Sequence, residues 1–173
     1  MIILSIACQS SSMDGTVQSV NLEKFSGKWY SLSSIPTGFD NNWRETTQTY
    51  RINSKGYIDI LTTYRRIKDR IQQSSTAKGF IVRGTNNAAW KIQFVWPFKS
   101  DYWIIELADD YSYAVVGHPK KKWLFILSRR PFLEPKLFQD IIRRCKDKGY
   151  NTDRLVSQDH EPENSQQRID PTL

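Results

Sequence analysis

The sequence predicts an all-β domain, an eight-stranded antiparallel up-and-down β-barrel with a C-terminal α-helix packed on its outside. Three observations support this. Residues 28–129 alternate in polarity in short segments, aromatic residues make up 13% of the chain, and the connections between segments are short with one exception. Consecutive hairpins fit an up-and-down barrel better than a Greek-key sandwich, which needs a long crossover. A chain of 173 residues is long enough for one such domain.

Eight segments alternate between apolar and polar residues and are predicted to be strands. They are 28–35, 46–53, 57–67, 70–83, 88–96, 101–108, 111–118 and 122–129. Turn-forming residues such as Asn53-Ser54-Lys55-Gly56 separate them. The exception is the stretch 35–45, whose length in an otherwise tight meander is typical of a lid or a binding loop.

Gly27 and Trp29 begin the first predicted strand. Glycine permits a tight backbone turn, and the large Trp29 side chain needs cover when it is buried. The last strand must pair with the first for the barrel to close, so we expect Arg129 to lie over the indole in a cation–π contact. The alternative is that Trp29 is a core aromatic with no special partner.

In each strand the larger side chains share one face, which we expect to point into the barrel. This inward set includes Thr62, Arg66, Phe94, Trp96, Phe125 and Arg129. An eight-stranded barrel either fills its interior or holds one small ligand. The polar members of the set suit the lining of a pocket better than the filling of a core.

Residues 134–148 are predicted to form a helix. Pro135 suits a first helical turn, apolar residues follow at helical spacing, and Gly149 suits the end. We interpret the apolar stripe as packing against the barrel rather than as a partner-binding face. The barrel domain is then expected to span 21–158.

The two ends of the chain are predicted to lie outside this domain. Residues 1–20 read as a truncated lipoprotein-signal-like segment and a flexible tether, and 159–173 as a polar, disordered tail. Cys8 ends an apolar run, and it is either a lipid attachment site or an ordinary free thiol. A bridge between Cys8 and Cys145 is compatible with the sequence but has no positive support.

The sequence offers little support for catalysis. His118 and His160 cannot be placed beside a nucleophile with a third, orienting residue, and the sequence contains no metal-ligand spacing and no phosphate-binding glycine loop. We therefore expect no enzyme, no metal and no cofactor. The net charge of +7 is compatible with nucleic acid or an anionic membrane. The alternative, a basic barrel that binds single-stranded nucleic acid, would need exposed rings beside the basic groups, whereas alternation directs most large rings inward.

Three motifs occur in order along the chain. They are Gly27-Lys28-Trp29-Tyr30, Asp110-Tyr111, and Ile126-Leu127-Ser128-Arg129-Arg130-Pro131. With these motifs, residues 20–159 resemble a lipocalin, specifically the bacterial outer-membrane lipoprotein branch and its animal relative apolipoprotein D. The first motif matches the G-x-W signature and the third is close to Ile-Leu-Ser-Arg-x-Pro. The second is partial, since the family usually has Thr-Asp-Tyr.

The resemblance implies binding, storage or transport of a small hydrophobic ligand, a fatty acid or a lysophospholipid, inside the barrel. Family pocket positions map onto Tyr50, Thr62, Arg66, Tyr102 and Phe125, and the inward face adds Phe94 and Trp96. Arg66 either pairs with a carboxylate or phosphate head group or is an exposed arginine at a strand end.

The resemblance also implies a location for the protein. Lipid attachment at Cys8 would hold it on the periplasmic face of the outer membrane of a Gram-negative bacterium, as a monomer or a homodimer. An enzyme on the same fold that acts on a bound lipid is the alternative function, and it would need a reactive residue inside the barrel.

Overall fold

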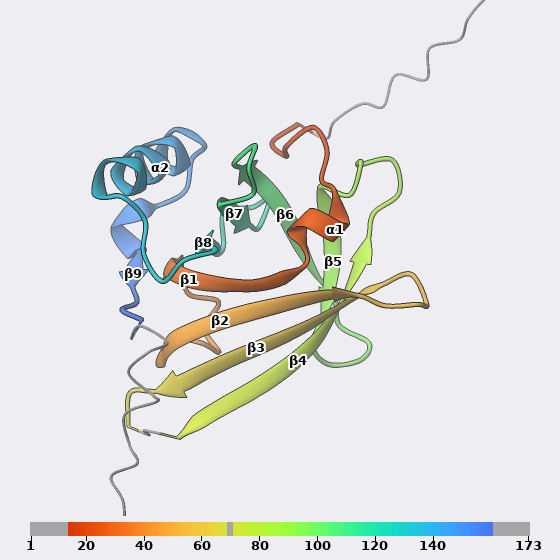
Figure 1. The fold of residues 1–173 in the computed structure, drawn as a ribbon, viewed down its shortest axis with the longest axis horizontal. Coiled ribbons are helices and arrows are strands. Elements are labelled where there is room, and N and C mark those ends of the chain that lie inside the picture. Colours follow the sequence, from red (N-terminus) through yellow and green to blue (C-terminus); the bar gives the residue numbers. More distant parts are fainter. Residues whose placement is uncertain (1–13, 69–70, 161–173) are drawn as a thin grey trace, which may run out of the picture.

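A computed structural model describes residues 14–68 and 71–160, which form a closed antiparallel β-barrel (Figure 1). The strands are β1 (Gly27–Ile35), β2 (Trp43–Ile52), β3 (Ile58–Arg66), β4 (Gln72–Ile81), β5 (Ala89–Gln93), β6 (Ser100–Leu107), β7 (Tyr113–Gly117), β8 (Leu124–Ser128) and the short β9 (Val156–Ser157). The helices are α1 (Leu22–Phe25), α2 (Pro135–Asp147) and the 3₁₀ helix η1 (Thr152–Arg154).

Consecutive strands pair from β1 to β8, and β8 pairs with β1 to close the barrel. The predicted fold class, including the C-terminal helix outside the barrel, is therefore confirmed. The short strand β9 pairs antiparallel with the second half of β1, at Ser33 and Ser34. Neither β9 nor α1 was predicted, because two and four residues are too few for a periodic pattern.

The two ends of the barrel differ. One end carries the β2–β3, β4–β5 and β6–β7 connections together with α1, and we call it the closed end. The other carries the connections β1–β2, β3–β4, β5–β6 and β7–β8, and we call it the open end. The long β1–β2 connection, expected to be a lid or a binding loop, lies at the open end.

At the closed end, Arg129 lies over Trp29 as the alternation predicts. The guanidinium carbon is 3.8 Å from the centroid of the indole ring, and Trp29 is completely buried. The guanidinium also donates to backbone carbonyls on both sides of Gly27, at Lys24, Phe25, Ser26 and Lys28, over 2.6–3.2 Å. The indole N–H donates to the Phe25 carbonyl at 2.8 Å.

Buried apolar residues form two separate clusters, one on each side of the barrel wall. The inner cluster fills the closed half of the barrel with aromatic rings, including Phe25, Trp29 and Trp90. The outer cluster joins the outward faces of β6, β7 and β8 to Ile141 and Cys145 of α2. Figure 1 shows α2 beside β8 and β9, away from β3 and β4.

An ion-pair cluster fixes α2 on the barrel. Arg144 donates to Glu106 of β6 from Nε and Nη2 at 3.0 and 2.6 Å, and Lys148 Nζ lies 3.6 Å from the same carboxylate. The Glu134 carboxylate caps the start of α2, where it accepts the backbone N–H groups of Lys136 and Leu137. The helix therefore has a structural role, as its apolar stripe predicts.

Residues on both sides of the predicted domain, 21–158, also pack against the barrel. On the N-terminal side, Val17 N–H donates to the Ile104 carbonyl at 2.9 Å and Val20 is buried. Residues 14–20 therefore belong to the packed structure rather than to the expected tether. Residues 1–13, with Cys8, lie outside the described residues.

The C-terminal side shows the same difference. The Gln158 side chain accepts the Thr46 N–H at 2.8 Å, and a ring nitrogen of His160 lies 2.9 Å from the Ser31 carbonyl oxygen. The expected tail therefore begins after His160 at the earliest, because local sequence does not reveal such long-range contacts. Residues 161–173, which make up the rest of the expected tail, lie outside the described residues.

Candidate functional site

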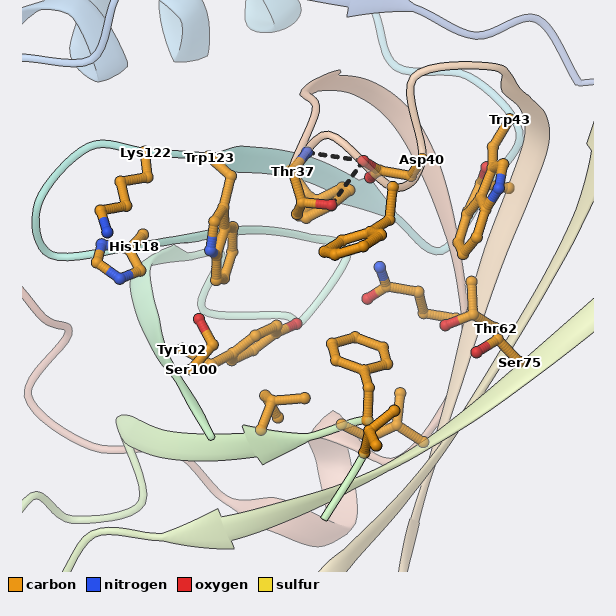
Figure 2. A pocket seen from close by; sticks show the side chains of 18 of the residues that line it. Thr37, Asp40, Trp43, Thr62, Ser75, Ser100, Tyr102, His118, Lys122 and Trp123 are labelled. Atoms are coloured by element: carbon orange, nitrogen blue, oxygen red, sulfur yellow. Dashed lines mark hydrogen bonds between the residues drawn. The ribbon is translucent and has the colours of Figure 1, made fainter. Parts of the chain in front are cut away.

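A cavity of about 730 Å³ opens between the loops of the open end and reaches down into the barrel (Figure 2). Its volume falls within the range of roughly 300–1,000 Å³ that is usual for sites that hold small molecules. It occupies the half of the barrel that the aromatic cluster leaves unfilled. The cavity is therefore open at one end and sealed at the other.

The floor of the cavity is aromatic. Tyr102 stacks on Trp90, with ring centroids 5.5 Å apart and planes 13° apart, and above this floor the side-wall residue Trp123 lies 5.5 Å from both Tyr102 and Phe125. These rings come from β5, β6 and β8 or its edge, where alternation directs every second side chain inward. Their packing prevents a ligand from passing through to the closed end.

A small hydrogen-bond network lies in this floor. The Tyr50 hydroxyl donates to Gln48 Oε1 and shares a hydrogen bond with the Tyr102 hydroxyl. Burial raises the pKa of Tyr50 and of Tyr102 well above the ordinary phenol value. Both phenols are therefore neutral at pH 7, and the floor presents uncharged polar groups to a ligand.

The two sides of the cavity differ in polarity. Thr46, Gln48, Thr62 and Ser75, from β2, β3 and β4, line one side, and apolar or aromatic side chains such as Ile92, Phe94, Trp123 and Phe125 line the other. Figure 2 shows Thr62 and Ser75 across the cavity from Tyr102 and Trp123. The buried Thr46 hydroxyl has no hydrogen-bond partner among the described residues. A ligand can therefore find hydrogen-bonding groups along one side of a mainly apolar space.

Charged side chains reach the cavity near its mouth. The cations in its lining are Lys99 of the β5–β6 connection and Lys122 of the β7–β8 connection. The Asp40 carboxylate accepts the N–H and the hydroxyl of Thr37 at 2.7 and 2.8 Å, which holds the β1–β2 connection in shape. The cavity therefore presents positive charge at its entrance and none at its floor.

His118 lies beside Lys122 at the edge of the cavity (Figure 2). Burial is the main cause that lowers its pKa below the ordinary histidine value. Lys122 and Lys120 lower the pKa further, while Asp101 acts in the opposite direction. Its Nδ1 accepts the Lys120 N–H at 3.0 Å. The neutral ring therefore carries its hydrogen on Nε2.

The structure brings four of the seven expected ligand-binding residues to the cavity lining. These are Thr62, Phe94, Tyr102 and Phe125. Tyr50 lies just beneath, where it is buried and bonded to Tyr102.

Arg66 and Trp96 are exposed and are not among the residues that line the cavity. Arg66 is the exposed last residue of β3. Trp96 is 82% exposed, because β5 ends at Gln93 and strand alternation no longer applies beyond that residue.

Sequence reasoning did not select several lining residues. Thr46 and Gln48 share the inward face of β2 with Tyr50, so alternation along that strand carries a signal for them. Trp123 shares a face with Phe125 in the same way. Lys99, Lys122 and His118 lie in connections, where no periodic pattern applies, and only the folded barrel shows that they meet.

Within residues 14–68 and 71–160, no group of three or more histidine, cysteine, aspartate or glutamate side chains is placed to hold a metal ion. The same part of the chain contains no helix long and apolar enough to cross a bilayer.

Comparison with known proteins agrees with the barrel fold described above. Residues 20–160 match the model of a lipocalin-like domain. The chain is 29% identical to the outer membrane lipoprotein Blc of Vibrio cholerae, over 81% of this chain and 82% of that protein. It is 28% identical to temperature-induced lipocalin-1 of Arabidopsis thaliana, over 80% and 78%. Insecticyanin of the tobacco hornworm Manduca sexta shares the fold with a TM-score of 0.65 and 18% identity, over 87% of both chains.

Proposed function

Because the chain belongs to the lipocalin-like family, whose members bind or transport small hydrophobic ligands, we propose that it binds, stores or transports a fatty acid or a lysophospholipid in the barrel. The observation that carries this proposal is the shape and polarity of the cavity. It has an apolar side, an uncharged floor, and cations at the mouth alone among its lining residues.

The polarity supports one orientation of such a ligand. A carboxylate at the floor would lie among neutral phenols without a cation, and burying an unpaired charge is costly. At the mouth it meets Lys99, Lys122 and solvent. The ligand therefore enters tail first, with its anionic head group near these two lysines. Lys99 and Lys122 would therefore pair with the head group, the role that the resemblance suggested for Arg66.

The apolar tail supplies the affinity. Transfer of an acyl chain from water is favourable by about 0.8 kcal/mol per methylene, so a chain of about sixteen carbons provides on the order of 10 kcal/mol. Part of this is lost to the immobilisation of the ligand. Micromolar binding therefore needs no specific polar contact. The ligand-binding residues that we propose are Thr62, Phe94, Tyr102 and Phe125, with Tyr50 supporting Tyr102 from below.

The relatives support a location. Proteins similar to this chain in Vibrio cholerae, Citrobacter freundii and Escherichia coli are named outer membrane lipoproteins. We place this protein likewise at the outer membrane, on the periplasmic face, with a lipid attached to Cys8. Labelling of cells with a radioactive fatty acid tests this, since wild-type protein should incorporate the label and Cys8→Ser should not. A labelled Cys8→Ser protein would contradict the assignment.

Displacement of a fluorescent fatty acid tests the cavity. Thr62→Phe introduces a ring into the lining and should weaken lysophospholipid binding by at least about tenfold. Leu61→Phe, at the neighbouring position on the outward face of β3, should bind as the wild type does. Urea unfolding of both variants shows that they are folded. Equal affinities in Thr62→Phe and wild type would place the ligand outside the cavity.

A further inference from the structure

Exposed apolar side chains gather at the open end of the barrel. Of the ten large apolar side chains that are exposed in the described residues, seven belong to connections at that end. Four lie within 94–98, two are Ile67 and Ile71 at the ends of the β3–β4 connection, and one is Phe39. Phe39 and Trp96 are 91% and 82% exposed. We call these seven side chains the apolar rim.

The apolar rim is too large to be ordinary surface. Four of its members are aromatic, and an aromatic side chain presents about 150–250 Å² when fully accessible. At the observed exposures they alone expose on the order of 600 Å², which matches or exceeds the largest apolar patch of a typical soluble monomer. Phe39, Phe94 and Phe98 also line the cavity, so the rim surrounds its mouth. Such a patch marks an interaction site.

Cations lie in the connections of the same end of the barrel. Among the described residues of 36–42, 67–71, 94–99 and 118–123, the charged side chains are Lys68, Lys99, Lys120, Lys121 and Lys122 against the single acid Asp40. Exposed aromatic rings together with lysines fit the boundary between lipid head groups and acyl chains. There the rings lie among the head groups and the lysines meet anionic phosphates.

We propose that the open end docks on an anionic lipid bilayer, with the apolar rim inserted among the head groups and the cavity mouth facing the membrane. This contact is separate from any lipid at Cys8, which lies outside the described residues. A second copy of the chain fits the surface less well, because two open ends would bring two sets of lysines together. The docking surface does not depend on the identity of the ligand.

Vesicle co-sedimentation of the full chain carrying Cys8→Ser tests the proposal without a lipid anchor. The protein should bind vesicles of phosphatidylcholine that contain roughly one-third phosphatidylglycerol. Binding should be at least about tenfold weaker to pure phosphatidylcholine vesicles, and also to the anionic vesicles at high salt. The triple variant Ile67→Ser, Ile71→Ser, Trp96→Ser should lose at least about tenfold in partitioning. None of these three side chains lines the cavity, so displacement of a fluorescent fatty acid in solution should be unchanged.

A matched triple variant controls for the loss of exposed apolar surface in general. Ile52→Ser, Leu61→Ser, Phe132→Ser removes the three large apolar side chains that are exposed away from the open end within residues 14–68 and 71–160, and it should bind vesicles as the parent does. Equal loss in the two triple variants, or a parent that fails to sediment, overturns the proposal. So does a parent that is dimeric in sedimentation velocity and becomes monomeric in the rim variant without binding vesicles. Ligand binding in solution is measured separately, so its failure would count against the proposed function and not against docking.

Discussion

Arg129→Ala should destabilise the protein without weakening its ligand binding. The guanidinium stacks on the buried indole of Trp29 and donates to carbonyls of Lys24, Phe25, Ser26 and Lys28. It therefore ties α1 and the start of β1 to the end of β8. The cavity lies at the opposite end of the barrel, and Arg129 is not among its lining residues.

The size of the effect follows from these contacts. The cation–π contact contributes about 0.5–2 kcal/mol. Loss of the charged donor adds about 1.5–3 kcal/mol. This second contribution is reduced because water reaches the half-buried site, and because the Phe25 carbonyl still accepts a hydrogen bond from the indole N–H of Trp29. We expect a loss of about 2–4 kcal/mol in the free energy of unfolding. With an m-value of about 2 kcal/mol/M, the urea midpoint falls by about 1–2 M.

Urea unfolding followed by tryptophan fluorescence measures this loss, and two further variants serve as controls. Arg130→Ala removes the same side chain type one position on, where it is exposed, and should change stability by less than about 0.5 kcal/mol. Arg129→Lys keeps the charge but not the planar fork, and should recover less than half of the loss. An Arg129→Ala protein as stable as Arg130→Ala, or one that loses ligand affinity while it keeps its stability, would refute the assignment of Arg129 to barrel closure.

Three further changes have definite outcomes. Gly27→Ala should cost about 1–2 kcal/mol in unfolding free energy by the same urea assay, because Gly27 has φ of 99° and an added Cβ would lie 3.2 Å from the guanidinium. Burial is the main cause that lowers the pKa of His118 and of His160, so the folded state binds fewer protons. The free energy of unfolding should therefore fall as the pH drops below about 6.5. The double variant His118→Gln, His160→Gln should show a smaller fall, and a pH profile unchanged from that of the wild type would contradict this prediction. Burial raises the pKa of the Cys145 thiol to about 12, so in a Cys8→Ser background maleimide should label native protein slowly at pH 8 and unfolded protein fast.

The barrel was predictable because each of its strands follows a pattern of period two. The inward face of Thr62 and the pairing of β1 with β8 follow from alternation and closure, and the position of Arg129 over Trp29 follows from both. Alternation no longer applies beyond the end of a strand, as at Trp96 after β5. Local sequence also lacks the information that Val17, Gln158 and His160 pack on the barrel, since their partners are distant in sequence.

The cavity was only partly predictable for a related reason. Alternation assigns residues to the interior, but it does not tell how far the filling of the interior extends. The stacked rings of Trp90 and Tyr102 decide that the closed half is full and the open half is hollow. The cations at the mouth come from two connections whose meeting depends on the closed barrel.

The central claim is that the open half of the barrel takes an acyl tail, and calorimetric titration with saturated fatty acids of increasing length tests it most directly. Each added methylene that enters the cavity should tighten binding by up to about fourfold, which corresponds to about 0.8 kcal/mol. The increase should stop when the tail fills the cavity, and it should stop at a shorter chain length in Thr62→Phe. An affinity that does not change with chain length from about eight to about sixteen carbons would contradict the claim.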